Sequence, residues 1–390
     1  MNETYRSGSR RAPAFQEPRQ SAPAPMPKKK KKSGLLGRII RRFFLLLFTV
    51  ILLAVAALYL VLNMVFNGPS PAARKILTMS LTEASATKWV PGLFMDEETV
   101  AEIRKNVDAE LPDEVTDTSQ VVIQTGSISG NSDEWADYPD GIYVEDIQGK
   151  TYNAHVMIIR DPAQVYMATS TSGNFSRNVP GKRITEVIET EGAIAAVNAG
   201  AFFDNGTAGP EVGSTPEGLV IADGKVRWNS GKAPEEGFVG FNQDNIMVVA
   251  KTMTADRAME LNIRDGCCFG PVLIMNGEVS MEAYNSASGF NPRTALGQRA
   301  DGAVIFLCID GRQAGSIGGT YADIIDIMLE YGAVNACNMD GGSSSVMLYR
   351  DTYGRYGEAG QVRMMNTYSV IQAEPRKMPN FWMVRPASEG

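Results

Sequence analysis

Residues 303–345 read AVIFLCIDGRQAGSIGGTYADIIDIMLEYGAVNACNMDGGSSS, and this stretch decides the fold class. The apolar runs 303–309 and 333–337 predict two buried strands. Between them a helix is expected at 321–331. Thr320 and Asp323 have capping-box spacing and Gly332 supplies a stop; the apolar face consists of Ile324, Ile325, Met328 and Leu329.

The rest of the chain beyond residue 120 consists mainly of short β-branched segments separated by Gly, Asn and Asp. Strands are expected at 121–123, 155–159, 193–197, 218–221, 246–249, 272–275 and 303–309. Strands therefore outnumber helices, and no repeat of solenoid length is visible. The predicted fold class is α+β, a single strand-rich domain at 120–390 with a mixed sheet and few helices.

Charge is distributed unevenly along the 390 residues. Residues 1–42 hold twelve of the 37 Lys and Arg residues but only two of the 44 acids, and residues 43–66 hold no charge. Residues 67–390 therefore carry 25 basic and 42 acidic side chains, a net charge of −17. An acidic body of this kind argues against nucleic acid as a partner, because phosphate binding needs a basic surface.

Residues 43–66 read FFLLLFTVILLAVAALYLVLNMVF and predict a transmembrane helix, since about 20 apolar residues cross a bilayer core. Lys28–Lys32 and three arginines precede this segment, whereas the residues just after it are uncharged. The positive-inside rule then predicts a single-pass cell-membrane protein with a cytoplasmic N-terminus and an extracellular body. A cleaved signal peptide is the alternative; the long leader and long apolar stretch disfavour it.

The expected domain organisation follows from these boundaries. Residues 1–42 form a basic, disordered cytoplasmic tail, 43–66 the transmembrane helix, and 67–119 a stalk and helical linker with one helix at 96–111. Residues 120–390 form the extracellular domain.

Histidine and cysteine restrict the chemistry further. His155 is the single histidine, which excludes sites with several imidazole ligands, and its place in an expected strand predicts a structural role. Cys267, Cys268, Cys308 and Cys337 do not have zinc-site spacing, and their pairing is left open. Cys308 lies in an apolar run and is expected to be a buried free thiol.

Three apolar runs end in a polar residue close to glycine, which places functional groups where a strand turns. These groups are Asn198 with Gly200, Asp310 with Gly311 and Arg312, and Asp340 with Gly341, Gly342 and the serines 343–345. Adjacent glycines can form a concave set of backbone N–H groups that binds an anion.

Arg293 and Thr294 precede another expected strand, and a guanidinium binds phosphate or carboxylate bidentately. Two carboxylates can cleave a glycosidic bond without imidazole, and the arginine and glycines suit an anionic leaving group. The residues alone do not separate this chemistry from a carboxylate-bound metal site.

At these residues the sequence resembles the phosphodiester glycosidase family. The resemblance lies in ordered blocks: VNAGAFF (197–203), PEGLVIADGKV (216–226), FGPVLIMNGE (269–278), NPRTALG (291–297), IDGRQ (309–313) and NMDGGSSS (338–345). It implies hydrolysis of a sugar-1-phosphodiester, which releases the sugar and leaves a phosphomonoester. Ala199 and Ala201 replace a glycine and an aromatic residue that the family commonly has, so the sugar specificity is left open.

The resemblance also implies roles for individual residues. Asp310 and Asp340 are the acid/base candidates, Arg293 would hold the phosphate, and Asn198 would orient the substrate. Substrate or phosphate binding is assigned to Gly200, Glu217, Thr294, Arg312, Gly341, Gly342, Ser343 and Ser344. The expected partner is a glycan or glycosyl phosphodiester, in cell-wall or exopolysaccharide metabolism.

Three alternatives stay open. The enzyme could transfer the sugar to a hydroxyl acceptor in place of water, or the domain could bind or assemble glycans without catalysis. No cofactor is required by the sequence, although a divalent cation is compatible with the carboxylates. Trp135, Tyr138 and Tyr143 are either sugar-stacking faces or ordinary core and rim residues.

Overall fold

The computed structural model describes residues 35–82, 87–104, 114–123, 135, 137–171, 173–203, 212–231, 237–368 and 374–387. The chain divides into two compact units, residues 1–60 and 61–390. The basic run Lys28–Lys32 and the first 34 residues lie outside the described part.

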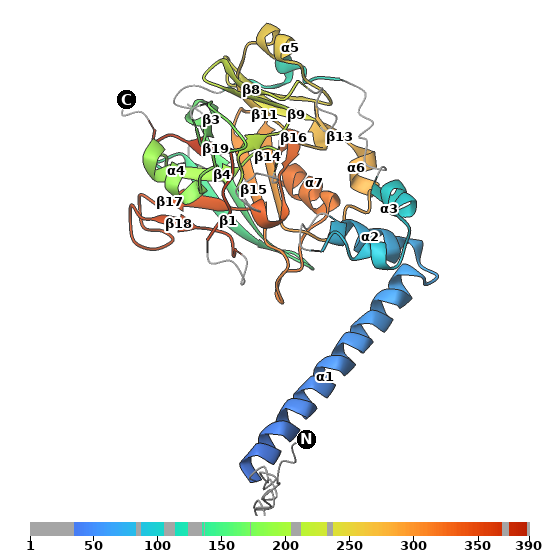
Figure 1. Ribbon diagram of the computed structural model, residues 1–390. Coiled ribbons are helices and arrows are strands. Elements are labelled where there is room, and N and C mark those ends of the chain that lie inside the picture. Colours follow the sequence, from blue (N-terminus) through green and yellow to red (C-terminus); the bar gives the residue numbers. More distant parts are fainter. Residues whose placement is uncertain are drawn as a thin grey trace, which may run out of the picture. The chain divides into compact units, whose positions relative to one another are not determined.

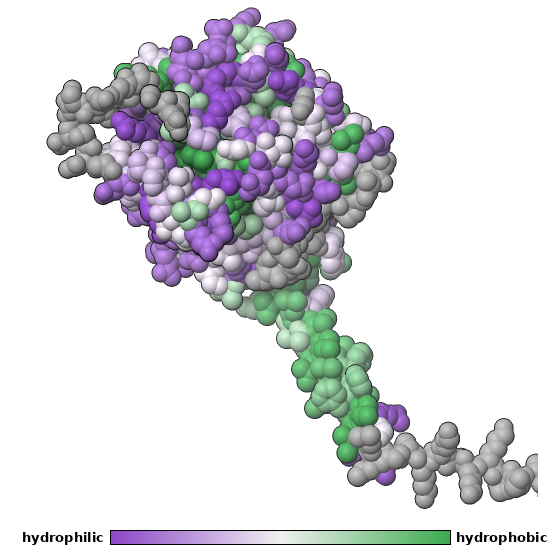
Figure 2. Space-filling view, turned by 90° about the vertical axis from the view of Figure 1, so that its left-hand side faces the viewer, coloured by the Kyte–Doolittle hydropathy of each residue, from purple (hydrophilic) through white to green (hydrophobic). Residues whose placement is uncertain are grey.

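An apolar helix, α1 (Leu35–Phe66), begins eight residues before the expected segment and includes Arg38, Arg41 and Arg42. Most of its side chains are exposed, although Phe66 at its end is buried, and its surface is apolar along most of its length (Figure 2). The helix is long and apolar enough to cross a membrane, a property that signal sequences share.

Short helices follow α1 along the chain: α2 (Pro71–Thr82), η1 (Pro91–Leu93), α3 (Glu97–Arg104) and η2 (Thr118–Gln120). The carboxylate of Asp96 accepts a hydrogen bond from the Thr99 amide at 2.8 Å, the expected start of the helix predicted for 96–111. Residues 105–113 of that prediction lie outside the described residues. Helix α2 contacts the body, because Ser80 Oγ accepts a hydrogen bond from the Phe290 amide at 2.9 Å.

The body contains three larger sheets and one two-stranded sheet (Figure 1). The first, in spatial order, is β1 (Ile142–Gln148), β2 (Asn153–Ile159), β15 (Val304–Ile309), β14 (Arg293–Arg299), β16 (Ala333–Met339), β12 (Val272–Met275) and β13 (Glu278–Val279). The second is β10 (Met247–Ala250), β9 (Phe238–Asn242), β11 (Ile263–Cys268), β7 (Leu219–Ala222) and β8 (Lys225–Asn229). The third is β18 (Val362–Met364), β17 (Met347–Arg350), β4 (Ala195–Asn198), β19 (Asn380–Val384) and β3 (Val165–Thr169), and the small pair is β5 (Phe202–Phe203) and β6 (Thr215–Pro216).

All three larger sheets contribute to one central core. This core contains Leu296 of β14, Val239 of β9 and the fully buried Trp382 of β19. Each sheet also has a helix on its other face: α7 (Tyr321–Glu330) on the first, α5 (Ala255–Glu260) on the second and α4 (Ile184–Glu191) on the third. The remaining short helices are α6 (Met281–Asn285), η3 (Pro162–Gln164) and η4 (Gly342–Ser344).

The α+β class is confirmed, and the sheets take an antiparallel form. Every pairing between the described strands is antiparallel. The strands β15 and β16, which α7 connects, run parallel to each other but are not neighbours, because β14 lies between them. The expected mixed sheet would require at least one parallel pair of strands, and none occurs among the described strands.

Six of the seven strands expected beyond residue 120 are confirmed, as β2, β4, β7, β10, β12 and β15. The strand expected at 121–123 is wrong. Val122 donates a single backbone hydrogen bond to Ala300 O at 2.9 Å, and one bond does not make a ladder. The expected helix and its capping box are confirmed in α7.

Replacement of Thr320 by alanine tests how far this cap supports the fold. Thr320 Oγ1 accepts a hydrogen bond from the Asp323 amide at 3.2 Å, and Asp323 Oδ2 accepts one from the Thr320 amide at 2.7 Å. We expect Thr320→Ala to lower the free energy of unfolding by about 1 kcal/mol. Urea titration of the full chain in detergent would measure it. Thr320→Ser keeps the hydroxyl and should retain most of the stability; equal losses in both variants would contradict the assignment.

Candidate active site

The topology brings two carboxylates to one edge of the seven-stranded sheet. Strand β14 pairs with β15 on one side and β16 on the other, with Arg293 opposite Ile309 and Thr294 opposite Met339. The residues that follow these two strands, Asp310 and Asp340, therefore flank the start of β14. Because one strand separates them, their backbones lie roughly 10 Å apart.

A pocket of about 70 Å³ lies at this edge. It is lined by Pro292, Asp310, Gly311, Arg312, Gly342, Ser343, Ser345, Asn366, Thr367 and Tyr368. The structure thus places Asp310, Arg312, Gly342 and Ser343 of the predicted residues around one cavity, and Gly341 and Asp340 directly precede Gly342 in the chain.

Asp310 is a buried carboxylate that the fold holds from two sides. Only 2 % of it is exposed, and Oδ1 accepts a hydrogen bond from the Thr367 amide at 2.9 Å. Its other oxygen, Oδ2, lies 3.7 Å from Nε2 of His155, which is an ion-pair distance and too long for a hydrogen bond. The carboxylate is therefore fixed in place next to an imidazole.

His155 reaches Asp310 because β2 pairs with β15, which places His155 opposite Cys308. Its Nδ1 lies 2.7 Å from Oδ1 of Asp146, a neighbour on β1, whereas its buried Nε2 has no hydrogen-bond partner among the described residues. Burial by itself lowers the pKa of His155, but the nearby carboxylates of Asp310 and Asp146 outweigh burial and raise the pKa above its ordinary value. The histidine is thus more than a packed core residue, since it links an exposed carboxylate to a buried one.

The glycine-rich loop after β16 has a different role from the one expected. The Gly342 amide donates to Pro292 O at 2.8 Å, so it does not point at an anion. A side chain at Gly341 would lie 2.9 Å from Pro292 O, and one at Gly342 would lie 3.1 Å from Arg312 Nη2. The two glycines therefore allow the loop to pack against Pro292 and the Arg312 guanidinium.

Two of the three serines of this loop have buried hydroxyls with no hydrogen-bond partner among the described residues, Ser344 and Ser345. Ser345 lines the pocket, and Ser344 is only 1 % exposed. A buried hydroxyl without a partner costs free energy, so a ligand in this pocket would gain a hydrogen bond from Ser345.

The two arginines near the edge differ in their surroundings. Arg293 is 3 % exposed; its guanidinium donates to Ser288 O at 2.6 Å and Gly289 O at 3.2 Å, and stacks 4.6 Å from the Tyr321 ring. Arg293 packs with Tyr321 on the face of the sheet that α7 covers. The next residue, Thr294, lies opposite Cys308 and faces the central core on the other side of the sheet. The guanidinium that lines the pocket belongs to Arg312, which also donates to Asn291 Oδ1 at 3.0 Å.

Four other predicted residues, Asn198, Gly200, Glu217 and Thr294, are not among the residues that line the pocket. Asn198 is fully buried: it donates to Asp340 O at 2.6 Å and accepts from Thr294 Oγ1 at 2.7 Å. At Gly200 a side chain would lie 2.8 Å from Cys268 O, and the Glu217 amide donates to Ala201 O at 2.8 Å. Asn198 and Thr294 therefore tie the Asp340 strand to β4 and β14 from inside the core.

Several residues at the pocket were not predicted. They are His155, Asn366, Thr367, Tyr368 and Arg376, whose guanidinium donates to Ser343 Oγ at 3.3 Å, and Ser345 was predicted only as part of the serine run. Residues 366–368 follow β18 without a recognisable motif, and only pairing with β17 brings them here. The serine run was the one sequence signal that pointed to Ser345.

Metal and disulfide chemistry find little support in the described residues. They contain no group of three or more His, Cys, Asp or Glu side chains placed to hold a metal ion. All four cysteines are buried and free, and the expected burial of Cys308 is confirmed.

Comparisons with known proteins give the following matches. Residues 191–385, half of the chain, match the profile of the family described as phosphodiester glycosidase. A curated relative, the SPbeta prophage-derived uncharacterized protein YomE of Bacillus subtilis (strain 168), is 26 % identical over 192 residues, which is 47 % of this chain and 27 % of the relative. The chain thus spans about a quarter of the length of that relative.

Two solved structures are similar at low identity. The zebrafish N-acetylglucosamine-1-phosphodiester alpha-N-acetylglucosaminidase catalytic domain, auto-inhibited by its pro-peptide, has a TM-score of 0.49 and 20 % identity, over 63 % of this chain and 82 % of that one. A hypothetical protein from Synechocystis has a TM-score of 0.42 and 16 % identity, over 63 % of this chain and 62 % of that one.

The raised pKa of His155 predicts a pH-dependent contribution to stability. A raised folded-state pKa means that the charged imidazole stabilises the fold below the unfolded value of about 6.5, and this contribution is lost as the pH rises through the folded value. We expect His155→Gln to lower the free energy of unfolding more at about pH 5.5 than at about pH 8.5. Urea titrations at both pH values would measure the difference, with the exposed Asp244→Asn as control. A loss that does not change with pH would contradict the charged imidazole.

Proposed function

This chain belongs to the phosphodiester glycosidase family, and on that premise we propose that it is a membrane-anchored hydrolase of glycosyl phosphodiesters. Water adds to the anomeric carbon, the bond from that carbon to the phosphate oxygen breaks, and the free sugar and a phosphomonoester are released. The observation that carries the proposal is the single pocket that combines the buried carboxylate of Asp310 with the Arg312 guanidinium and the Ser345 hydroxyl.

The phosphate fits the part of the pocket formed by Arg312, Ser343 and Ser345. Arg312 provides a planar charged donor, and the Ser345 hydroxyl has no other hydrogen-bond partner among the described residues. Arg376 adds positive charge through its contact with Ser343. These groups would stabilise the charge that develops on the departing phosphomonoester.

Proton transfer is assigned to Asp310 with His155 behind it. Asp146 has a side chain that is 72 % exposed and hydrogen-bonds Nδ1 of His155, whereas Nε2 of the same ring faces Asp310, whose side chain is 2 % exposed. The imidazole thus lies between an exposed carboxylate and the buried one. In this scheme Asp310 is the catalytic acid/base and His155 is a positioning residue beside it.

Asp340 supplies the second carboxylate, from the strand end on the other side of β14. Its position depends on Asn198, which accepts a hydrogen bond from Thr294 and donates one to the Asp340 carbonyl. Asn198 therefore acts through Asp340 in this proposal, and Arg293 acts by holding the loop 288–291 that leads into Pro292.

Placement of the body outside the membrane rests on the charge asymmetry around α1. Basic residues precede the apolar segment and uncharged residues follow it, which favours a cytoplasmic N-terminus. An extracellular glycosyl phosphodiesterase would act on a cell-wall or exopolysaccharide component.

Substitution of either carboxylate tests the reaction. We expect Asp310→Asn and Asp340→Asn each to lower the rate of sugar release by at least about 100-fold, because each removes a group that donates or accepts a proton in the transition state. The full chain in detergent is incubated with a panel of sugar-1-phosphodiesters that includes UDP-N-acetylglucosamine, and free sugar and phosphomonoester are both quantified.

The matched control is Asp244→Asn, which removes an exposed carboxylate in the turn between β9 and β10. Full activity in this variant with loss in the other two supports the proposal. Sugar release at the wild-type rate from Asp310→Asn would exclude the role given to that residue.

The orientation is tested separately from the activity. We expect a cysteine placed at Ser70 to react with a membrane-impermeant maleimide added to intact cells, and one at Ser33 to react only after permeabilisation, because α1 separates the two positions. The endogenous cysteines are buried and serve as the unlabelled background in the wild-type chain. Labelling of position 33 in intact cells would reverse the topology.

A further inference from the structure

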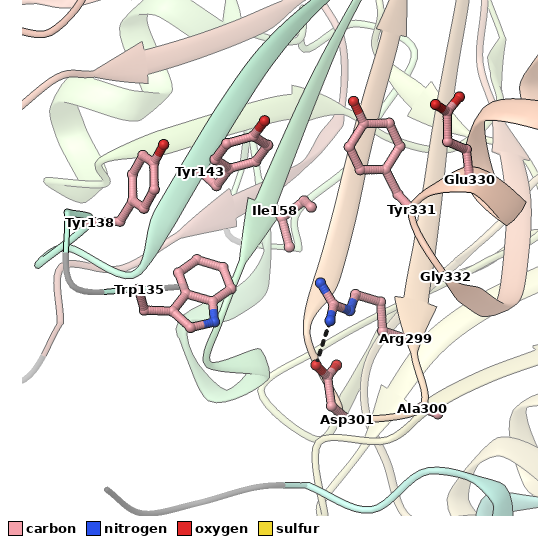
Figure 3. Close-up of a pocket in the computed structure, with 10 residues that line it drawn as sticks. All are labelled: Trp135, Tyr138, Tyr143, Ile158, Arg299, Ala300, Asp301, Glu330, Tyr331 and Gly332. Carbon is pink, nitrogen blue, oxygen red and sulfur yellow. Dashed lines mark ion pairs between the residues drawn. The ribbon is translucent and has the colours of Figure 1, made fainter. Parts of the chain in front are cut away.

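A second and larger pocket lies at the opposite end of β14 from the Asp310 pocket. It has a volume of about 750 Å³ and is lined by Trp135, Tyr138, Tyr143, Ile158, Arg299, Ala300, Asp301, Glu330, Tyr331 and Gly332 (Figure 3). Arg293 begins β14 and Arg299 ends it, so roughly 20 Å of extended chain separates the two sites. Pockets that bind organic ligands have volumes of about 300–1,000 Å³.

Four aromatic side chains form the walls of this pocket. Trp135, Tyr138 and Tyr143 lie on one side and Tyr331 on the other (Figure 3). The ring of Tyr138 meets those of Trp135 and Tyr143 edge to face, with centroids 6.3 Å and 5.3 Å apart. These rings supply the apolar part of a lining that also contains polar and charged groups.

One carboxylate fixes the tyrosines on both walls. Glu145 accepts hydrogen bonds from the hydroxyl of Tyr143 and, at 2.7 Å, from that of Tyr331. Its hydrogen bond to Glu145 and its burial raise the pKa of Tyr143. Burial and its own hydrogen bond to Glu145 raise the pKa of Tyr331. Both rings are therefore neutral and are held in position before any ligand arrives, which lowers the entropic cost of binding.

The charges around the pocket are those of a site for an uncharged, hydroxyl-rich ligand. Arg299 Nη2 forms an ion pair of 2.9 Å with Asp301 Oδ2, which neutralises the one cation among the lining residues, and Glu330 adds a negative charge. Such a pocket repels phosphates, in contrast to the Asp310 pocket with Arg312. The carboxylates and the guanidinium can still exchange hydrogen bonds with hydroxyl groups.

We propose that this pocket binds a neutral segment of a saccharide chain, away from the glycosyl-phosphate bond that is cleaved. The apolar faces of sugar rings cover the aromatic walls, and their hydroxyls bind Asp301, Glu330 and Arg299. The inference rests on the proposed function in one respect: a polymer cleaved at the Asp310 pocket is long enough to occupy both sites, whereas a short glycosyl phosphodiester occupies only one.

Binding to defined saccharides tests the proposal without requiring turnover. The full chain, in a detergent without a sugar headgroup, is titrated calorimetrically with neutral hexasaccharides: cello-, malto-, manno- and chitohexaose. At least one hexasaccharide should bind, and Trp135→Ala and Tyr331→Ala should each weaken that binding about tenfold or more. Trp89→Ala, which removes a tryptophan that is 62 % exposed elsewhere, should leave binding unchanged.

The same variants are assayed for hydrolysis of UDP-N-acetylglucosamine, which is too short to span both pockets. Unchanged hydrolysis with lost hexasaccharide binding supports a separate site. If no substrate is hydrolysed but Trp135→Ala still loses binding, the saccharide site stands and the proposed reaction fails. Three results would overturn the inference. The wild type binds no hexasaccharide, all variants bind it equally, or the wild type binds polyphosphate more tightly than any hexasaccharide and Trp135→Ala weakens that binding.

Discussion

The antiparallel pairing of β14 with both β15 and β16 is the constraint on which the rest of the site depends. The hydrogen-bond ladders fix the register of these three strands, so the start of β14 lies beside the ends of β15 and β16. Asp310 and Asp340 lie at this edge because their strands run the same way on either side of β14. A register shift by one residue would turn Thr294 away from Asn198 and remove the bond that ties the Asp340 strand to β4.

Burial explains why the chemistry is assigned to Asp310. A carboxylate that is 2 % exposed needs polar partners, and the Thr367 amide and the His155 imidazole are those partners. His155 is in turn oriented by Asp146, at the surface of β1. A single histidine therefore has an influence on the site that its place in the middle of a strand does not suggest.

The sequence predicted those parts of the fold and site that local patterns determine. The capped helix α7 and six of the strands follow from periodicity and capping residues, and Asp310 and Arg312 follow from a turn at a strand end. The choice between Arg293 and Arg312 could not be predicted, because it depends on which face of β14 carries Arg293 and on how the turn after β15 directs Arg312. Likewise, Thr367 and Tyr368 reach the pocket only through the pairing of β18 with β17, a long-range contact without a local signal.

The contact of α2 with the loop 288–291 links the helix that follows α1 in the chain to the pocket lining. Ser80 of α2 binds the Phe290 amide, and a side chain at Gly289 would lie 2.6 Å from the Ser80 amide nitrogen, so helix and loop are packed without a gap. This loop also holds the Arg293 guanidinium and, through Asn291, that of Arg312. A change in α2 would therefore be felt at the Arg293 and Arg312 guanidiniums, through loop 288–291, before it reached the central core.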